Sequence, residues 1–257
     1  MAAEPDSLQT SEDAVLDGRL RLRQPLRGHR VGHDAILLAA ATGGRAGELA
    51  VDLGAGVGGA GLALAVRVER LNVVLVEIDA ALARLAAGNA RANGLGDRVR
   101  VITSDAENIA ALAAAGLAAG AVDRVLMNPP FHDAARHNVS PDARRRLAHA
   151  GGLDLLQRWL ACADVLLKPR GVLTLIWRAD ELNGVLAALA ARFGTAVMPL
   201  LPRDGAAPIR ILIRVVKDGG GASTFAPALV LNDAQGQPTA AAEAVLRGGQ
   251  KLTLVED

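Results

Sequence analysis

The segment Asn128-Pro129-Pro130-Phe131 follows the apolar run 122–127 and combines groups that can hold a planar amino group. The side-chain oxygen of Asn128 and the carbonyl oxygen of Pro129 can each accept one of the two hydrogens, which directs the nitrogen lone pair toward an electrophile. Two successive prolines stiffen the backbone and pre-position these acceptors. Phe131 can stack on the planar group, worth ~1–3 kcal/mol for a base. The segment therefore predicts catalysis by orientation through Asn128, Pro129 and Phe131, without a metal or a strong general base.

A glycine-rich segment, 54–59, directly follows the short apolar run 49–53. Glycines here let the chain turn tightly and bring backbone N–H groups close to a ligand. Glu77 ends the next apolar run, 21 positions after Gly56, where a carboxylate can bind ribose hydroxyls. Dinucleotide enzymes share this pattern, but Asp52 would repel a pyrophosphate and attract the positively charged methionine moiety of S-adenosylmethionine. We therefore expect S-adenosylmethionine as the cofactor; the alternative role for Asp52 is to cap the following turn.

Apolar, β-rich runs alternate with helical stretches along most of the chain. The predicted strands are 49–53, 72–76, 99–103, 122–127 and 172–177, and the predicted helices are 35–42, 60–70, 80–93, 153–167 and 180–192. This alternation predicts a parallel sheet covered on both faces. The last runs, 195–200 and 209–216, are too close for a crossover helix and must be antiparallel neighbours. We therefore expect an α/β fold that resembles the seven-stranded Rossmann-like methyltransferase sheet, with helices on both faces and one antiparallel strand near the C-terminus.

The expected organisation has three parts. Residues 1–17 are acidic and polar, without the basic and apolar regions of a signal peptide, and should form a flexible N-terminus. Residues 18–45 should form an N-terminal hairpin and helix extension, with His33-Asp34 capping the helix. Residues 46–257 should form the methyltransferase domain.

The end of the third predicted strand, 103–107, looks like the matching region of class I methyltransferases. That resemblance implies that Asp105 accepts a hydrogen bond from the adenine amine and that Ala106 supplies a backbone contact. The alternative is that Asp105 caps a helix over 106–114. The predicted cofactor-binding residues are Asp52, Gly54, Ala55, Gly56, Gly58, Glu77, Ile78, Asp105, Ala106 and Asn128.

Asn-Pro alone often marks only a turn. The alternative to a functional role for this segment is a rigid turn with Phe131 in the core. Asn-Pro-Pro-aromatic after the fourth strand of a glycine-loop protein is more specific: it resembles the signature of methyltransferases that modify planar amino nitrogens. The chain also carries Val31-Gly32-His33-Asp34-Ala35-Ile36-Leu37-Leu38. This segment resembles the V-G-x-D-A-x-L-L motif of the bacterial family that methylates adenine N6 in the anticodon loop of valine tRNA.

That family also places a polar, Arg-containing stretch after the acceptor segment, here 140–149, followed by an amphipathic helix with Trp159. The resemblance, which runs from about residue 19 to the end, implies tRNA as the RNA substrate. The predicted substrate-binding residues are Pro130, His132, Arg144 and Arg145. Phe131 is followed by His132, where the family commonly has a second aromatic residue.

Other readings remain open at this point. A protein glutamine N5-methyltransferase shares the Asn-Pro-Pro-aromatic segment but usually has a separate helical N-terminal domain. An amino-nitrogen methyltransferase acting on rRNA, a small-molecule O-methyltransferase and a binding module that retains the cofactor fold without chemistry are the further alternatives.

The bulk composition restricts these readings only slightly. The formal net charge of +1 says little about RNA, although Arg clusters at 19–30 and 144–146 favour bidentate phosphate contacts. The single Cys162 excludes an internal disulfide framework and a multi-cysteine zinc site. No apolar stretch predicts a membrane span. We expect a cytoplasmic protein with no metal, and the composition does not indicate an oligomeric state.

Overall fold

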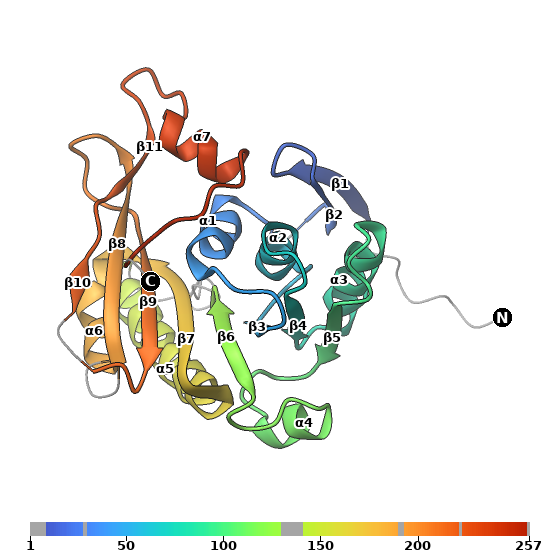
Figure 1. Ribbon diagram of the computed structural model, residues 1–257. Helices are drawn as coiled ribbons and strands as arrows, with labels where there is room; N and C mark the ends of the chain where they lie inside the picture. Colours follow the sequence, from blue (N-terminus) through green and yellow to red (C-terminus); the bar gives the residue numbers. More distant parts are fainter. Residues whose placement is uncertain (1–8, 28–29, 130–140, 190–192, 221–222, 256–257) are drawn as a thin grey trace.

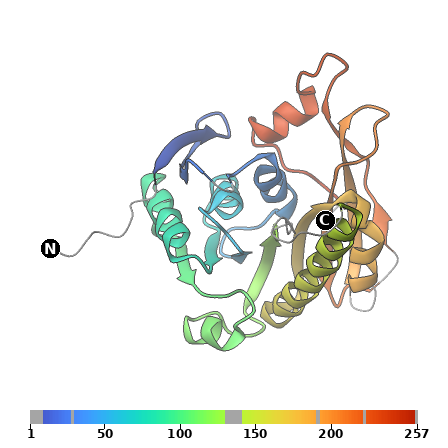
Figure 2. The same cartoon turned by 180° about the vertical axis from the view of Figure 1, so that it is seen from behind.

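The computed structural model describes residues 9–27, 30–129, 141–189, 193–220 and 223–255. In this part of the chain a large mixed sheet of nine strands forms the centre of the molecule, with helices on both of its faces (Figure 1, Figure 2). The strands of this sheet are β3 (Leu49–Leu53), β4 (Asn72–Glu77), β5 (Val99–Thr103), β6 (Val122–Met127), β7 (Leu167–Arg178), β8 (Phe193–Arg203), β9 (Arg210–Lys217), β10 (Thr224–Phe225) and β11 (Leu229–Asn232).

The strand order is β10-β8-β9-β7-β6-β3-β4-β5, and β11 also pairs with β8. Neighbouring strands are parallel except at β9, which pairs antiparallel with both β7 and β8. The expected seven-stranded methyltransferase sheet with one antiparallel strand is therefore confirmed. The two short strands β10 and β11 extend it, since both pair parallel with β8.

Helices cover the sheet in two groups. One face carries α1 (His33–Thr42), α2 (Gly59–Arg67), α3 (Ala80–Ala92) and α7 (Ala240–Leu246). The other carries α4 (Ile109–Ala114), α5 (Pro141–Leu166) and α6 (Leu182–Leu189), and a short 3₁₀ turn, Ala179–Glu181, precedes α6. Each group buries its own apolar cluster against the sheet, so the central strands are apolar on both faces, as a doubly covered parallel sheet requires.

The register brings the ends of the parallel strands to one edge. Leu53 pairs with Val76 on one side and with Met127 on the other. The segments that follow β3, β4, β5 and β6 therefore leave the sheet at the same edge, called here the carboxyl edge. In open α/β sheets this is the edge at which ligands bind.

An antiparallel hairpin of β1 (Thr10–Val15) and β2 (Leu20–Pro25) forms a separate two-stranded sheet beside α3. The hairpin corrects part of one expectation, because residues 10–15 belong to an ordered strand rather than to a flexible N-terminus. Local polarity suggested flexibility, but pairing with the apolar-patterned β2 supplies the hydrogen bonds of this polar strand. Residues 1–8 lie outside the described part of the chain.

The expected cap of α1 is also wrong. Gly32 occupies the N-cap position and no side chain caps the helix. The Asp34 carboxylate instead accepts a hydrogen bond from Arg210 Nε at 3.0 Å, which ties the start of α1 to the start of β9. A partner 176 positions away in the chain is invisible to reasoning from neighbouring residues.

Helix boundaries differ most at α5, which begins at Pro141 rather than at 153. No helix in the described residues is long and apolar enough to cross a membrane.

Candidate active site

The glycine segment between β3 and α2 is anchored on the neighbouring strand. The N–H groups of Gly54 and Ala55 both donate to the carbonyl oxygen of Val76 at 2.9 Å, and Gly58 N–H donates to the Ala55 carbonyl at 2.8 Å. Gly56 has φ +57, a left-handed conformation that favours glycine. A Cβ built on Gly56 would meet nothing within 4 Å, so its backbone borders open space.

Glu77, at the end of β4, is bonded to this loop. Its Oε2 accepts the N–H of Gly56 at 2.7 Å and its Oε1 accepts the N–H of Asp79 at 2.8 Å. Each carboxylate oxygen can accept a further hydrogen bond. The side chain is therefore oriented by backbone donors and keeps the capacity to bind hydroxyl groups. Ile78, the next residue, is 66% exposed, unlike nearly all other large apolar residues of the described chain.

Asp52, the second-to-last residue of β3, is only 3% exposed. Its Oδ2 accepts the N–H of Gly61, in the first turn of α2, at 2.8 Å. The pKa of Asp52 is raised to about 7, chiefly by burial and also by the charge of Glu77, while the Gly61 hydrogen bond opposes this rise. The carboxyl group thus joins β3 to the first turn of α2, whereas the alternative considered for it was to cap the turn that follows β3.

Asp52→Asn is expected to stabilise the cofactor-free protein above neutral pH and to have much less effect in acid. In the folded chain the pKa of Asp52 is about 7, against an ordinary value of 3.8, so the folded state binds more protons between these values. The stability contributed by this group is complete below 3.8 and is lost as the pH rises through 7, by at most about 4 kcal/mol. The measurement is urea unfolding of both proteins at about pH 4, 6 and 8. A stability difference that does not change with pH would contradict it.

The segment after β5 contacts α5. The Asp105 Oδ1 accepts the N–H of Glu107 at 2.9 Å, in a turn, and its side chain is exposed. The helix that follows, α4, is capped by Asn108, whose Oδ1 accepts the N–H of Ala111 at 3.0 Å. The alternative reading of Asp105 as a helix cap is therefore wrong, because a better-placed Asn lies three residues later.

Two side chains of α5 hold this segment. Cys162 Sγ donates to the carbonyl oxygen of Ala106 at 2.7 Å, and Arg158 pairs with Glu107 at 2.9 Å. Burial, followed by the charges of Glu107 and Asp105, raises the pKa of the Cys162 thiol to about 11. The thiol therefore stays protonated at neutral pH and keeps its hydrogen to donate.

Asn128 follows the last residue of β6 and so stands at the carboxyl edge next to the end of β3. Its Oδ1 is buried and has no hydrogen-bond partner among the described residues. A buried acceptor without a partner is costly in a folded protein and calls for a specific explanation. Pro129 is buried beside it.

The remaining predicted acceptor residues, Pro130, Phe131 and His132, lie outside the described residues. Arg144 and Arg145 belong to α5, but the structure does not describe their side chains. Their assigned roles stay predictions.

Trp159 is a site residue that sequence reasoning named only as part of a family pattern. It is 8% exposed, and a Cβ built on Gly54 would lie 2.3 Å from its Cη2 atom. The indole therefore packs directly on the first glycine of the loop. Trp159 and Cys162 are three residues apart on α5, so one helix face contacts both the segment after β3 and the segment after β5. The i, i+3 spacing of these two apolar residues is the feature of the sequence that could have predicted their contact with the site.

Two of the five N-terminal arginines, Arg19 and Arg30, bond to other parts of the protein. Arg19 donates to the carbonyl oxygens of Leu16 at 3.0 Å and Arg247 at 2.8 Å. Arg30 donates to the Pro25 carbonyl at 2.8 Å and pairs with Asp13. These two guanidinium groups stabilise the hairpin and the C-terminal segment, which weakens the expectation that the whole cluster contacts phosphate.

The family model described as the methyltransferase small domain matches residues 34–198. This chain belongs to that family. The match covers β3 to β6 with their helices and includes every cofactor-binding residue that the sequence predicts.

Solved structures agree with the family. A predicted O-methyltransferase from Agrobacterium tumefaciens is 26% identical and superposes with a TM-score of 0.71 over 86% of this chain and 98% of its own. A SAM-dependent O-methyltransferase from Thermotoga maritima is 18% identical, with a TM-score of 0.52 over 76% of this chain and 69% of its own. Pyrococcus horikoshii TYW2 in complex with MeSAdo is 14% identical, with a TM-score of 0.52 over 83% of this chain and 73% of its own. The last two share the fold. No curated protein matches.

The protein is therefore a class I methyltransferase that uses S-adenosylmethionine. The carboxyl edge of this methyltransferase fits that cofactor in three observed ways. Gly56 borders open space, the Glu77 carboxylate is held at the loop, and Ile78 presents an exposed apolar surface beside it. The described residues contain no group of three or more His, Cys, Asp or Glu side chains that could hold a metal ion.

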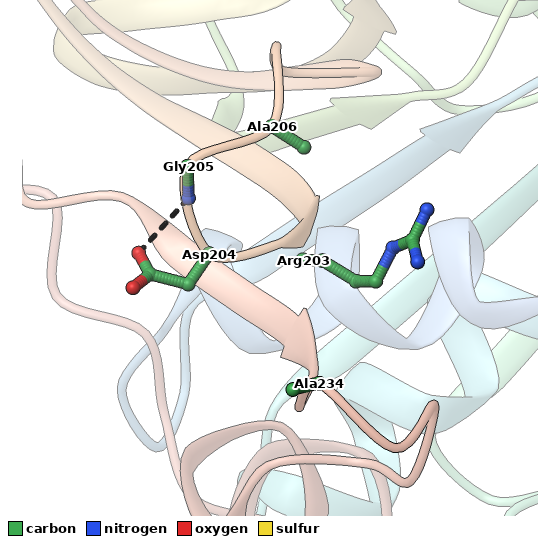
Figure 3. A pocket seen from close by; sticks show the side chains of 5 residues that line it. All are labelled: Arg203, Asp204, Gly205, Ala206 and Ala234. Atoms are coloured by element: carbon green, nitrogen blue, oxygen red, sulfur yellow. Dashed lines mark hydrogen bonds between the residues drawn. The ribbon is translucent and has the colours of Figure 1, made fainter.

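A shallow cavity of about 400 Å³ lies elsewhere on the methyltransferase (Figure 3). It is lined by Arg203, Asp204, Gly205, Ala206 and Ala234. These residues belong to the β8–β9 turn and to the segment after β11. None of the predicted site residues lines it, so we assign it no part in methyl transfer.

Proposed function

We propose that the enzyme methylates a planar amino nitrogen, and specifically N6 of an adenine in tRNA. The observation that carries the amino-nitrogen assignment is the buried Oδ1 of Asn128, which has no partner among the described residues and stands at the end of β6. An amino hydrogen of the substrate would satisfy this acceptor.

The chain's own contribution is orientation. Asn128 Oδ1 and the Pro129 carbonyl each accept one amino hydrogen, so the nitrogen lone pair is localised and held in one direction. When bound, S-adenosylmethionine would supply an electrophilic methyl group, carried on a positively charged sulfur, to the nitrogen that Asn128 and Pro129 orient. The methylated nitrogen then releases one proton to solvent. Orientation of this kind can contribute ~7–11 kcal/mol in favourable cases.

The cofactor contacts that we propose follow the carboxyl edge. Glu77 binds the ribose hydroxyls and Ile78 lines the adenine. Asp105 accepts a hydrogen bond from the adenine amine, and Ala106 supplies a backbone contact. Asp52, Gly54, Ala55, Gly56 and Gly58 form the wall nearest the methionine moiety. The buried position of Asp52 favours an indirect role, through the Gly61 N–H and the shape of the loop.

The tRNA assignment is supported by the V-G-x-D-A-x-L-L segment, Val31–Leu38. Pro130, Phe131, His132, Arg144 and Arg145 are the proposed substrate-binding residues. Among the N-terminal arginines, Arg21 and Arg23 are the exposed pair on β2 and the better candidates for a phosphate contact.

The test is incubation of the protein with S-adenosylmethionine labelled on the methyl group and, separately, total tRNA, rRNA and protein. Labelled tRNA digested to nucleosides should yield N6-methyladenosine, identified by chromatography and mass. Label on ribose or on a small-molecule oxygen, the chemistry suggested by the description of the Agrobacterium protein, would overturn the amino-nitrogen proposal. Label on a glutamine amide or in rRNA would retain it and overturn tRNA.

A further inference from the structure

Asn89, on α3, joins the glycine loop to the N-terminal hairpin. Its Nδ2 donates to the carbonyl oxygen of Val57 at 3.0 Å and to that of Arg23 at 3.1 Å. Its Oδ1 accepts the N–H of Arg23 at 2.8 Å. Asn89 is 3% exposed, so these bonds form away from water, where losing one leaves a buried polar group unsatisfied.

Val57 occupies a position in the loop that is flanked by two conformationally free residues. It lies between Gly56 and Gly58, whose φ values of +57 and +91 place both in the left-handed region. Glycines restrict the backbone least. A hydrogen bond to the intervening carbonyl, opposite the bond between Gly56 N–H and Glu77, therefore helps to define the path of the loop.

The hairpin supports the loop at a second point. The N–H of Val31 donates to Gln24 Oε1, in β2, at 2.7 Å. Held in this way, Val31 packs on the first residue of α2, because a Cβ built on Gly59 would lie 2.6 Å from Val31 Cγ2. The hairpin is thus linked to the loop through Asn89 and to the start of α2 through Val31.

We infer that Asn89 is a positioning residue for the cofactor: it holds the Val57 carbonyl against the β1–β2 hairpin and so keeps the glycine loop in its binding conformation. This inference rests on the proposed assignment of residues 54–58 to S-adenosylmethionine binding. The hairpin then acts as a support for the cofactor loop, whatever the methyl acceptor is.

The chain contains a matched control. Asn93, the C-cap residue of α3 one turn later, makes the same pair of bonds with β2: its Oδ1 accepts the N–H of Arg21 at 2.9 Å and its Nδ2 donates to the Arg21 carbonyl at 2.7 Å. Its other described bond is to the Asn89 carbonyl within the helix. Asn89→Ala and Asn93→Ala therefore both remove hairpin bonds, whereas only Asn89→Ala removes a bond to the loop.

The test is the affinity of each full-length variant for S-adenosylhomocysteine, measured by calorimetry beside the wild type. Asn89→Ala should weaken binding about tenfold, and Asn93→Ala should stay within about twofold. Amide hydrogen exchange in peptides covering 54–62 should be faster in Asn89→Ala alone. If Asn89→Ala does not fold, the pair Asn89→Leu and Asn93→Leu, which keeps the side-chain size, adds no charge and removes the hydrogen bonds, replaces it with the same expectation.

Equal affinities for the two variants, or unchanged exchange over 54–62 in the Asn89 variant, would overturn the inference. The variant Gly56→Val separates this failure from failure of the loop assignment. If Gly56→Val abolishes binding while the two Asn variants match, only the positioning role of Asn89 fails. If Gly56→Val binds normally, the loop is not the cofactor site and both fail.

Discussion

Replacing Asn128 by Ala should reduce methyl transfer by about 100- to 1,000-fold, the range typical for loss of one pre-positioned polar group at a reacting centre. The variant removes the buried Oδ1 that has no partner among the described residues, so the substrate amino group loses one of its two acceptors. The measurement is initial rate with labelled S-adenosylmethionine and the fraction that accepts methyl groups from the wild-type enzyme.

The cofactor should bind the Asn128 variant with an affinity within about threefold of the wild type, because orientation of the acceptor is what is lost. Asn128→Asp keeps an oxygen acceptor in place and should retain more activity than Asn128→Ala. A parallel loss of S-adenosylhomocysteine affinity and rate would leave Asn128 only the cofactor-binding role that the sequence also predicts for it and would contradict the orienting role. An unchanged rate would remove it from the site.

Gly56→Val should abolish measurable cofactor binding, with an affinity loss of at least about 100-fold. The Cβ and its methyl groups would project into the open space that Gly56 borders, and the side chain would block approach to the backbone. Because a Cβ built on Gly56 meets no atom of the described residues within 4 Å, its chain neighbours aside, a clash of that atom with the protein does not account for the expected loss. Calorimetric titration with S-adenosylhomocysteine measures the effect.

The matched control for this variant is Gly94→Val. Gly94 also has a left-handed φ, +68, and open space around a built Cβ, but it follows the end of α3 and does not belong to the loop. Both variants carry backbone strain of about 1–2 kcal/mol and should unfold at similarly lowered temperatures. Normal binding by Gly56→Val, or equal loss in both variants, would contradict the proposed path of the cofactor.

The parts of the fold that the sequence predicted are those encoded by local pattern. Apolar runs alternating with helical stretches predicted the sheet, and the short connection before 209–216 predicted the antiparallel β9. The spacing of Gly56 and Glu77 anticipated their neighbouring positions, although not the hydrogen bond between them. The positions of these strands and of Gly56 and Glu77 depend on turn geometry and strand order, which can be predicted from segments of a few tens of residues.

The features that the sequence did not predict depend on residues far apart in the chain or on two neighbouring residues that could fill the same role. Asp34 pairs with Arg210 rather than capping α1, and the polar segment 10–15 becomes a strand because β2 pairs with it. Asn108, rather than Asp105, caps α4. The sequence offered both residues as possible caps, three positions apart. The bonds of Asn89 join three segments, and no spacing in the sequence indicates that they meet.

The packing of Trp159 on Gly54 gives the protein an optical reporter of its own. The chain has two Trp residues and no Tyr, so the emission that is excited at wavelengths beyond the absorption of its Phe residues comes from the two indoles. One of them, Trp177, is 1% exposed and donates from Nε1 to Glu181 at 2.6 Å. The other lies against the loop that we assign to the cofactor. Events at that loop can therefore be followed in unlabelled protein, on the timescale of a stopped-flow mixer and without knowledge of the methyl acceptor.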